Sequence, residues 1–320
     1  MTEITTEIIS AIKASDKVLI CGHIRPDGDC IGSALAMRFI CENLGKTADA
    51  VCDAEKTDSF DFLPGYDSFN APRFNDYDLF IAVDCAIDTR LGEYRRFLDT
   101  AKNIIDIDHH PTNNKYGKIN FINGDACSTC EIIFDMFEGT GLIDKTVATC
   151  LYTGLSTDTG HFMHNNTTAK AFDIAASLCR MGVDAGTLNQ ELYKNKSFSR
   201  IRLTAKAIDG IILFENGQIA LMAITKEMLD SCNCTSDDTE GLIDYASSIR
   251  GVKISISMCD QPGGLFRVSF RSKKADVAAA AETFGGGGHK NAAGCIIKGN
   301  RYDVMEKTVA AAKAALDKLS

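Results

Sequence analysis

Apolar and polar positions follow two different periods over the first 185 residues of the chain. Short apolar runs predict strands at 17–22, 78–84 and 103–108. The longer segment 30–45 carries Ile31, Leu35 and Phe39 at helical spacing, with Gly45 at its expected end. Strands that alternate with helices predict an α/β domain, with a mostly parallel sheet flanked by helices.

The pattern changes after residue 186. The stretch 193–207 is basic and lacks a long apolar run, which is typical of a connector. Asn216 and Gly217 then separate two β-rich runs, a strong hairpin signal. Strand-like runs at 251–259 and 265–271, a helix-like segment at 274–283 and a closing helix near 303–319 predict a smaller α+β domain. The expected organisation is therefore a first domain over 1–186, a linker over 187–206 and a second domain over 207–320.

Composition places the chain among globular proteins. Its 320 residues exceed the usual size of a single core, and 45% of them are hydrophobic. No apolar run is long enough to cross a bilayer, and the N-terminal segment is acidic where a secretory signal would be basic. We therefore expect a cytoplasmic protein that does not enter membranes.

Cysteine usage agrees with a reducing compartment. The chain has 13 cysteines, an odd number, and many lie inside apolar runs where free thiols behave as small hydrophobic groups. The pairs in "CSTC" and "CNC" lack a second pair at zinc-finger spacing, so a structural role is the simpler prediction. The net charge of -9 argues against coating long nucleic acid, including long double-stranded nucleic acid, but a small anionic ligand needs only a local positive site.

Acidic and histidine residues gather in four clusters within the first domain. Three of the clusters follow a predicted strand directly, and ligands of open α/β sheets bind beyond the carboxyl ends of strands. Taken singly, each aspartate is more simply a turn former or a helix N-cap. Five of the six histidines nevertheless lie in or beside these clusters, which favours a common site. The clusters are His23 with Asp27 and Asp29, then Asp84, then Asp108 with His109 and His110, and finally Asp158.

Ligation of this kind suits a pair of divalent cations. Carboxylates with some imidazole favour Mn²⁺ or Mg²⁺, although Zn²⁺ and Fe²⁺ also accept these ligands. Two ions about 3.5–4 Å apart serve phosphoester hydrolysis, because they activate water and neutralise the phosphoryl oxygens. For His161 and His164, ordinary hydrogen bonding and a site role are both open.

A glycine-rich motif in the second domain offers a second anion-binding element. The stretch "FGGGGHKNAAG" at 284–294 fits either a flexible linker or bare backbone that approaches a phosphate. In the second case, His289 and the N–H groups of Gly286, Gly287 and Gly288 would donate. Arg271, at the end of a predicted strand, could clamp a phosphate through two N–H groups.

Together these motifs resemble a known family. "HIRPDGDCIGS", "VDC", "IDHH" and "STDTG" look like the four signatures of the DHH phosphoesterases, and "GGGGHKNAAG" looks like that of their associated C-terminal domain. The resemblance extends from about residue 15 to 320, and it is closest to members that act as oligoribonucleases and pAp phosphatases. It implies hydrolysis of very short oligonucleotides to nucleoside 5′-monophosphates, and removal of the 3′-phosphate of pAp.

The resemblance also implies roles for particular residues. One Mn²⁺ would be held by His23, Asp27 and Asp84, and a second by Asp29, Asp84, His109 and Asp158, with Mg²⁺ or Co²⁺ as substitutes. His110 would face the scissile phosphate and Asp108 would orient the imidazoles. Arg271, His289 and Gly286 to Gly288 would hold the substrate's terminal phosphate or downstream nucleotide. Members of this type are often homodimers through the N-terminal domain.

Several alternatives share parts of this pattern. A cyclic di-AMP phosphodiesterase would use the same chemistry. A single-stranded DNA exonuclease would need aromatic side chains on which bases stack, and a chain without Trp gives little sign of them. A pyrophosphatase should lack the glycine-rich ending. A nucleotide sensor without catalysis would tend to lose ligands that this chain retains.

Overall fold

The computed structural model describes residues 2–319 and divides the chain into two compact units. The first ends at Asn195 and the second begins at Lys196. This division falls within the predicted linker 187–206, which is largely helical because α7 (Ala185–Lys194) and α8 (Phe198–Asp209) occupy it. Each unit has its own sheet and core, and each is described by itself.

The first unit is built on a five-stranded sheet in which every pair of neighbours is parallel. The strands follow the order β2-β1-β3-β4-β5. Three of them match the predicted apolar runs, which confirms the α/β fold, whereas β2 and β5 are short and were not predicted. The bounds are β1 (Lys17–Cys21), β2 (Thr47–Val51), β3 (Leu79–Val83), β4 (Asn103–Asp108) and β5 (Ile119–Ile122).

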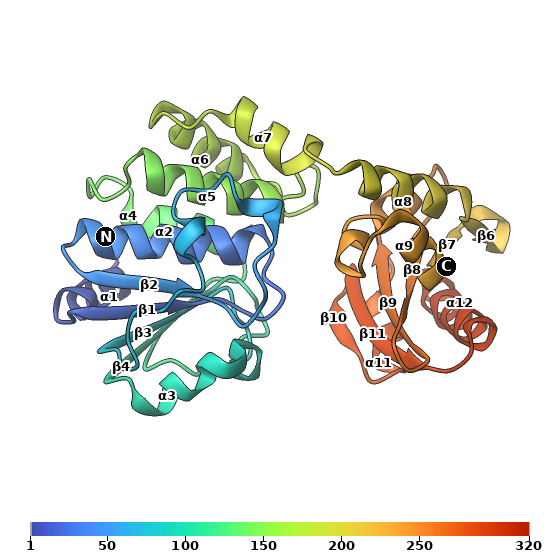
Figure 1. The fold of residues 1–320 in the computed structure, drawn as a ribbon, viewed down its shortest axis with the longest axis horizontal. Helices are drawn as coiled ribbons and strands as arrows, with labels where there is room; N and C mark the ends of the chain where they lie inside the picture. Colours follow the sequence, from blue (N-terminus) through green and yellow to red (C-terminus); the bar gives the residue numbers. More distant parts are fainter. Residues whose placement is uncertain (1, 320) are drawn as a thin grey trace. The chain divides into compact units, whose positions relative to one another are not determined.

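Helices cover both faces of this sheet (Figure 1). Val18 and Ile20 of β1 belong to a core shared with α1, α2 and α4 to α6, while Leu19 and Cys21 pack with Phe97 on the other side. Alternate residues of a buried strand thus reach opposite layers, as the two-residue period requires. The helical bounds are α1 (Glu3–Lys13), α2 (Gly28–Asn43), η1 (Asp58–Phe60), η2 (Tyr66–Ser68), η3 (Asp88–Arg96), α3 (Phe97–Thr100), α4 (Thr129–Phe137), α5 (Lys145–Asp158) and α6 (Ala169–Arg180).

Helices α2 and α5 approach closely at Gly32, so a larger side chain at this position is expected to destabilise the fold. A Cβ added at Gly32 would lie 2.6 Å from the carbonyl oxygen of Cys150 and 3.0 Å from the amide nitrogen of Gly154. Gly32→Ala should therefore lower the free energy of unfolding by about 1–3 kcal/mol through overpacking. Gly186→Ala, whose added Cβ would lie 3.5 Å from Oδ1 of Asp184, should be neutral or stabilising. Urea denaturation checks this prediction, and equal midpoints for the two variants would contradict it.

The second unit has a six-stranded mixed sheet in the order β10-β11-β9-β8-β7-β6. Strands β7 and β8 pair in parallel, and the remaining neighbours are antiparallel. The predicted hairpin is confirmed, because β6 and β7 flank the turn η4 (Glu215–Gly217). The strands are β6 (Ile212–Phe214), β7 (Ile219–Ile224), β8 (Ile254–Gln261), β9 (Leu265–Ser272), β10 (Gly287–His289) and β11 (Ala292–Lys298).

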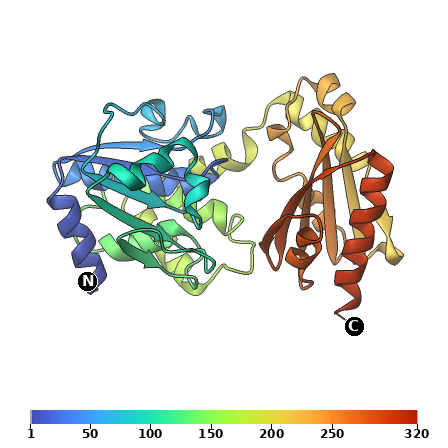
Figure 2. The ribbon, with the colours of Figure 1, turned by 90° about the horizontal axis from the view of Figure 1, so that it is seen from below.

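Helices also lie on both faces of the second sheet. Leu221 and Ile256 share a core with residues of α11 (Val277–Glu282) and α12 (Arg301–Asp317). The neighbouring Met222 instead packs with α8 and α9 (Lys226–Cys232). Figure 2 shows α12 lying along one side of this sheet. Two short elements complete the unit, η5 (Asp237–Thr239) and α10 (Ile243–Ser247).

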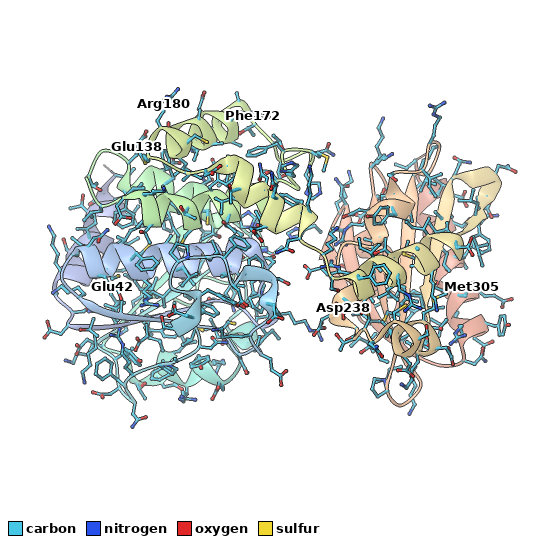
Figure 3. All side chains as sticks on the ribbon, turned by 45° about the horizontal axis from the view of Figure 1, so that its top comes forward. Glu42, Glu138, Phe172, Arg180, Asp238 and Met305 are labelled. Atoms are coloured by element: carbon cyan, nitrogen blue, oxygen red, sulfur yellow. The ribbon has the colours of Figure 1, made fainter. Side chains whose placement is uncertain are left out.

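Charged side chains lie on the outer side of the helical layer of the first unit. Figure 3 shows Glu138 and Arg180 on the outer side of the helical layer, and both are exposed. The 13 cysteines are free thiols and most of them are buried, as the apolar runs predict. None of the helices among residues 2–319 combines the length and the apolar character needed to cross a membrane.

Candidate metal centre

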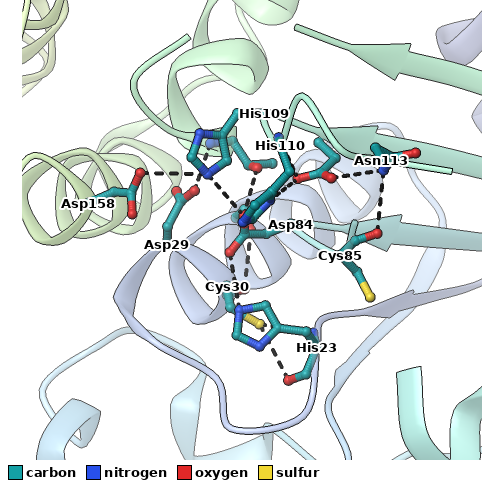
Figure 4. Close-up of polar contacts among 12 residues, drawn as sticks. His23, Asp29, Cys30, Asp84, Cys85, His109, His110, Asn113 and Asp158 are labelled. Atoms are coloured by element: carbon teal, nitrogen blue, oxygen red, sulfur yellow. Dashed lines mark hydrogen bonds and ion pairs between the residues drawn. The ribbon is translucent and has the colours of Figure 1, made fainter. Parts of the chain in front are cut away.

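The four clusters of acidic and histidine residues meet at the carboxyl edge of the first sheet (Figure 4). His23 follows β1, Asp84 follows β3, and Asp108 is the last residue of β4. The strands end together because Cys21 pairs with Ala82, and Val83 with Ile107. The fourth cluster is placed by a helix and not by a strand, since Asp158 is the last residue of helix α5.

Asp84 is the centre of this arrangement. Its Oδ2 lies 3.5 Å from Nε2 of His23, and its Oδ1 lies 3.5 Å from Nε2 of His109. The hydroxyl of Thr129 donates to Oδ1 at 3.1 Å. The backbone of Asp84 is left-handed, with φ of 54°, while its N–H donates to the carbonyl of Ile107. Such a conformation costs about 1–3 kcal/mol in a non-glycine residue, and it persists where the surroundings hold it in place.

His23 and Asp27 lie on one side of Asp84. The Oδ1 of Asp27 caps α2 by accepting from the backbone of Asp29 and Cys30, at 3.1 and 3.0 Å, and its Oδ2 lies 4.0 Å from Nε2 of His23. Nδ1 of His23 lies 2.7 Å from the carbonyl oxygen of Ile24. Because a carbonyl only accepts, Nδ1 carries the proton and the lone pair of Nε2 faces Asp84. Asp27 is therefore a helix cap and a neighbour of the cluster at once.

Asp29, His109 and Asp158 lie on the other side. One ligand atom from each falls within 4.8 Å of the others, and Oδ2 of Asp158 is 3.6 Å from Nε2 of His109. Asp29 accepts from the first two amides of α4, those of Thr129 at 2.6 Å and Cys130 at 3.0 Å. These bonds fix the carboxylate at the positive end of the helix.

Asp108 holds His110 in a defined orientation. The buried carboxylate accepts from Nδ1 of His110 at 2.7 Å and from the Asn113 amide at 2.8 Å. Burial opposes ionisation, but the His110 and Asn113 hydrogen bonds and the nearby imidazoles lower the pKa of Asp108 below its ordinary value. The ionised carboxylate therefore accepts the proton that Nδ1 of His110 carries, and this bond orients the ring.

The electrostatics of the cluster fit bound cations. Burial and then repulsion from Asp29 raise the pKa of Asp84 and of Asp158 well above the ordinary value. Burial likewise raises the pKa of Asp29. Although burial acts in the opposite direction, the charge of Asp84 raises the pKa of His109. Carboxylates crowded in this way repel one another unless positive charge lies between them, so the donor set fits divalent metal ions.

Asp106 is a buried acid that the sequence patterns did not indicate. Asp106 lies on β4 and is fully buried, and neither of its carboxylate oxygens has a hydrogen-bond partner. Burial is the main cause that raises its pKa to about 7, although the nearby Asn113 amide acts to lower that pKa.

This burial predicts a pH-dependent stability. An acid whose pKa is raised by folding binds its proton more tightly in the native state, so stability falls as the pH rises between the unfolded value, about 4, and 7. Asp106→Asn should remove that loss and raise the free energy of unfolding by about 1–2 kcal/mol at pH 8, and by less at pH 5. Denaturant titrations at both pH values test this. A variant that is less stable at pH 8 would contradict it.

His161 and His164 lie close to this region but outside the groups among residues 2–319 that could hold a metal ion. The His161 ring packs 4.4 Å from the Tyr193 ring, and the backbone N–H of His161 donates to the carbonyl of Ser156 at 2.7 Å. Nδ1 of His164 is 3.4 Å from the carbonyl oxygen of Asp158.

In the second unit, Arg271 and His289 share one face of the sheet. Arg271 pairs with Ala292 of β11, which pairs with His289 of β10, so the three form a row across adjacent strands. The glycine run is not a flexible linker, because Gly287–His289 forms the strand β10. A Cβ at Gly286 would meet the carbonyl oxygen of Gly294 at 2.2 Å, so glycine is needed for this close pairing. No described contact tests whether this backbone binds a phosphate.

Sequence reasoning missed several partners of the cluster. The sulfur of Cys30 lies close to the ligand atoms of His23 and Asp84. Thr129 donates a hydrogen bond to Asp84, and Asn113 donates one to Asp108. A signal existed for the start of α4, because Ser128 and Glu131 have capping-box spacing and the Glu131 amide donates to the Ser128 hydroxyl at 3.0 Å. Nothing in the sequence pattern indicated that this helix would begin against Asp29 and Asp84.

Comparisons with known proteins agree with the fold. The family models "DHH family, N-terminal domain" and "DHHA1 domain" match residues 17–155 and 218–318. The chain therefore carries a DHH domain in its first unit and a DHHA1 domain in its second. A crystal structure of an exopolyphosphatase-related protein from Bacteroides fragilis superposes with a TM-score of 0.89, at 27% identity and over 99% of this chain and 98% of that one.

Curated relatives match over nearly the whole chain. The probable bifunctional oligoribonuclease and PAP phosphatase NrnA of Streptococcus mutans is 29% identical over 93% of this chain and 94% of its own length. The bifunctional oligoribonuclease and PAP phosphatase NrnA of Bacillus subtilis is 27% identical over 91% and 93%. The cyclic-di-AMP phosphodiesterase PdeA of Listeria monocytogenes is 26% identical over 94% of this chain but only 48% of its own length.

Proposed function

We propose that this protein is a metal-dependent phosphodiesterase that hydrolyses very short linear oligonucleotides to nucleoside 5′-monophosphates and removes the 3′-phosphate of pAp. The observation that carries the proposal is the cluster around Asp84, which joins carboxylates and imidazoles from three sheet-edge loops and the end of α5. The full-length similarity to NrnA enzymes supports this choice of substrates.

Two cation positions suit the ligand atoms. His23, Asp27 and Asp84 would hold one ion, and Asp29, Asp84, His109 and Asp158 would hold the other, with Asp84 shared between them. Mn²⁺ agrees with this mixture of carboxylate and imidazole, and Mg²⁺ or Co²⁺ are expected substitutes. When bound, two such ions activate a water and neutralise charge on the phosphoryl group.

His110 and Asp108 would act on the leaving group. The bond from Nδ1 to Asp108 orients the His110 ring. Nε2 can then place a proton on the oxygen that leaves the phosphorus atom, which is general acid catalysis. Asp108 stays ionised throughout, because His110 and Asn113 satisfy its oxygens.

The second unit would bind the part of the substrate that does not react. Arg271 and His289 lie on the same face of its sheet, next to the exposed Gly287 and Gly288, whereas the N–H of Gly286 already donates to the carbonyl of Ala281 at 3.0 Å. A guanidinium, an imidazole and bare backbone amides together suit a terminal phosphate or a downstream nucleotide.

The test is product identification by mass spectrometry on a substrate panel with Mn²⁺ and with Mg²⁺. The panel contains pApA, pGpG, pAp, cyclic di-AMP, pyrophosphate and a longer single-stranded DNA. We expect AMP from pApA and pAp, and GMP from pGpG. A protein that binds Mn²⁺ but leaves pApA, pGpG and pAp intact would refute the proposal.

Cyclic di-AMP hydrolysis is the weaker candidate. It would use the same cluster, but this chain spans less than half of the PdeA relative. Turnover of cyclic di-AMP faster than of linear pApA, measured in the same panel, would reverse this preference.

A further inference from the structure

Arg90 lies beside the metal-facing histidine but outside the ligand set. It belongs to η3, which follows β3, and its carbonyl accepts the N–H of Ile24 at 2.8 Å. This bond ties the loop after β3 to the loop after β1. Nη2 of Arg90 is thereby brought to 3.1 Å from Nδ1 of His23.

This contact does not satisfy the guanidinium. Nδ1 of His23 already donates to the carbonyl of Ile24 at 2.7 Å, and a nitrogen that carries this proton cannot also accept from an arginine N–H. Arg90 makes no ion pair with a carboxylate of the described residues 2–319, whereas Arg95 pairs with Asp88 and Arg96 pairs with Glu93. A half-buried cation with unused donors therefore lies at the rim of an acidic cluster.

We infer that Arg90 binds a second phosphate of the substrate, next to the one that reacts. The inference rests on the proposed function and deepens it. The imidazole of His23 lies between the cluster around Asp84 and the proposed phosphate position at Arg90, because Nε2 faces Asp84 and Nδ1 faces Arg90. A guanidinium binds phosphate oxygens through two parallel N–H groups, so a 5′-phosphate or a 3′-phosphate one nucleotide away fits its donors.

The experiment combines a protein change with a substrate change. Arg90→Ala should lower kcat/KM for pApA by roughly tenfold to a hundredfold, mainly through KM, because a charge-assisted hydrogen bond is lost. The same variant should hydrolyse ApA, which lacks the 5′-phosphate, within about twofold of the wild type. Arg90→Lys should recover part of the loss, since it keeps the charge without the planar fork. Arg95→Ala, which removes a neighbouring paired arginine, is the matched control and should resemble the wild type on both substrates.

Calorimetric titration of Mn²⁺ separates this role from metal binding. Arg90→Ala should bind Mn²⁺ as the wild type does. Weaker Mn²⁺ binding, an equal loss on pApA and ApA, or no loss on pApA would each overturn the inference.

Failure of the proposed function gives a different result. If the wild type cleaves none of pApA, pGpG and pAp, that function is wrong, and the inference is then decided by titrating pAp and AMP into both proteins with Mn²⁺ present. A wild-type preference for pAp that disappears in Arg90→Ala supports the second-phosphate site. An unchanged preference, or no preference in the wild type, overturns it.

Discussion

Asp84→Asn is expected to reduce Mn²⁺-dependent hydrolysis of pApA by roughly a thousandfold or more. Asp84 is the one carboxylate whose two oxygens face imidazoles on both sides, at 3.5 Å from His23 and 3.5 Å from His109. Loss of its charge weakens both cation positions together, and metal ions supply several kcal/mol of transition-state stabilisation. The readouts are the initial rate with pApA and calorimetric titration of Mn²⁺.

The fold should survive this change. Burial and repulsion from Asp29 already raise the pKa of Asp84, so a neutral amide relieves repulsion in the metal-free protein. Its thermal midpoint without metal should equal or exceed that of the wild type at pH 8. Asp76→Asn, at an exposed position whose carboxylate pairs with Lys17 at 3.4 Å, is the control for a surface charge. Full activity in Asp84→Asn would place the chemistry elsewhere.

His110→Gln is expected to lower kcat by roughly a hundredfold to ten-thousandfold, with little change in KM or Mn²⁺ affinity. The change removes the group that protonates the leaving oxygen, while the residues around Asp84 keep their positions. Asp108→Asn should have a smaller effect, about tenfold to a hundredfold, because it only loosens the orientation of the His110 ring. Steady-state kinetics with pApA measure both variants.

A different result would reassign His110. Its Nδ1 lies 3.6 Å from Oδ1 of Asp84, and it belongs with Asp84, Asp108 and His109 to one group that could hold an ion. If His110→Gln weakens Mn²⁺ binding as strongly as Asp84→Asn does, the residue is a metal ligand and the proton comes from another donor.

The sequence predicted the fold best where a strand is a continuous apolar run. Strands β1 and β3 contain such runs, β4 carries Ile104, Ile105 and Ile107 with only Asp106 between them, and the Asn216-Gly217 turn marks the β6–β7 hairpin. Strand β2 was missed because "TADAV" carries a polar residue at its centre, the buried Asp49, which is satisfied by Arg73 and Tyr77 from outside the strand. Tertiary contacts of this kind leave no trace in local periodicity.

The site was predictable to a similar extent. Side chains that directly follow strands share an edge by topology, so the approach of His23, Asp84 and His109 could be inferred without coordinates. Arg90 and Thr129 could not, because each is a single polar residue whose position depends on the path of a loop or the start of a helix. Asp27 shows that a capping residue and a site residue need not be alternatives.

The hydrogen bonds of Asp29 determine what mutagenesis can reveal about this protein. The carboxylate that faces His109 also anchors the beginning of α4 through two amides, and α4 contributes to the main core. An Asp29 substitution would thus disturb architecture and chemistry in a single step. Loss of activity in an Asp29 variant would not distinguish a structural role from a catalytic one. Functional roles should therefore be assigned from side chains that do not also hold the fold together.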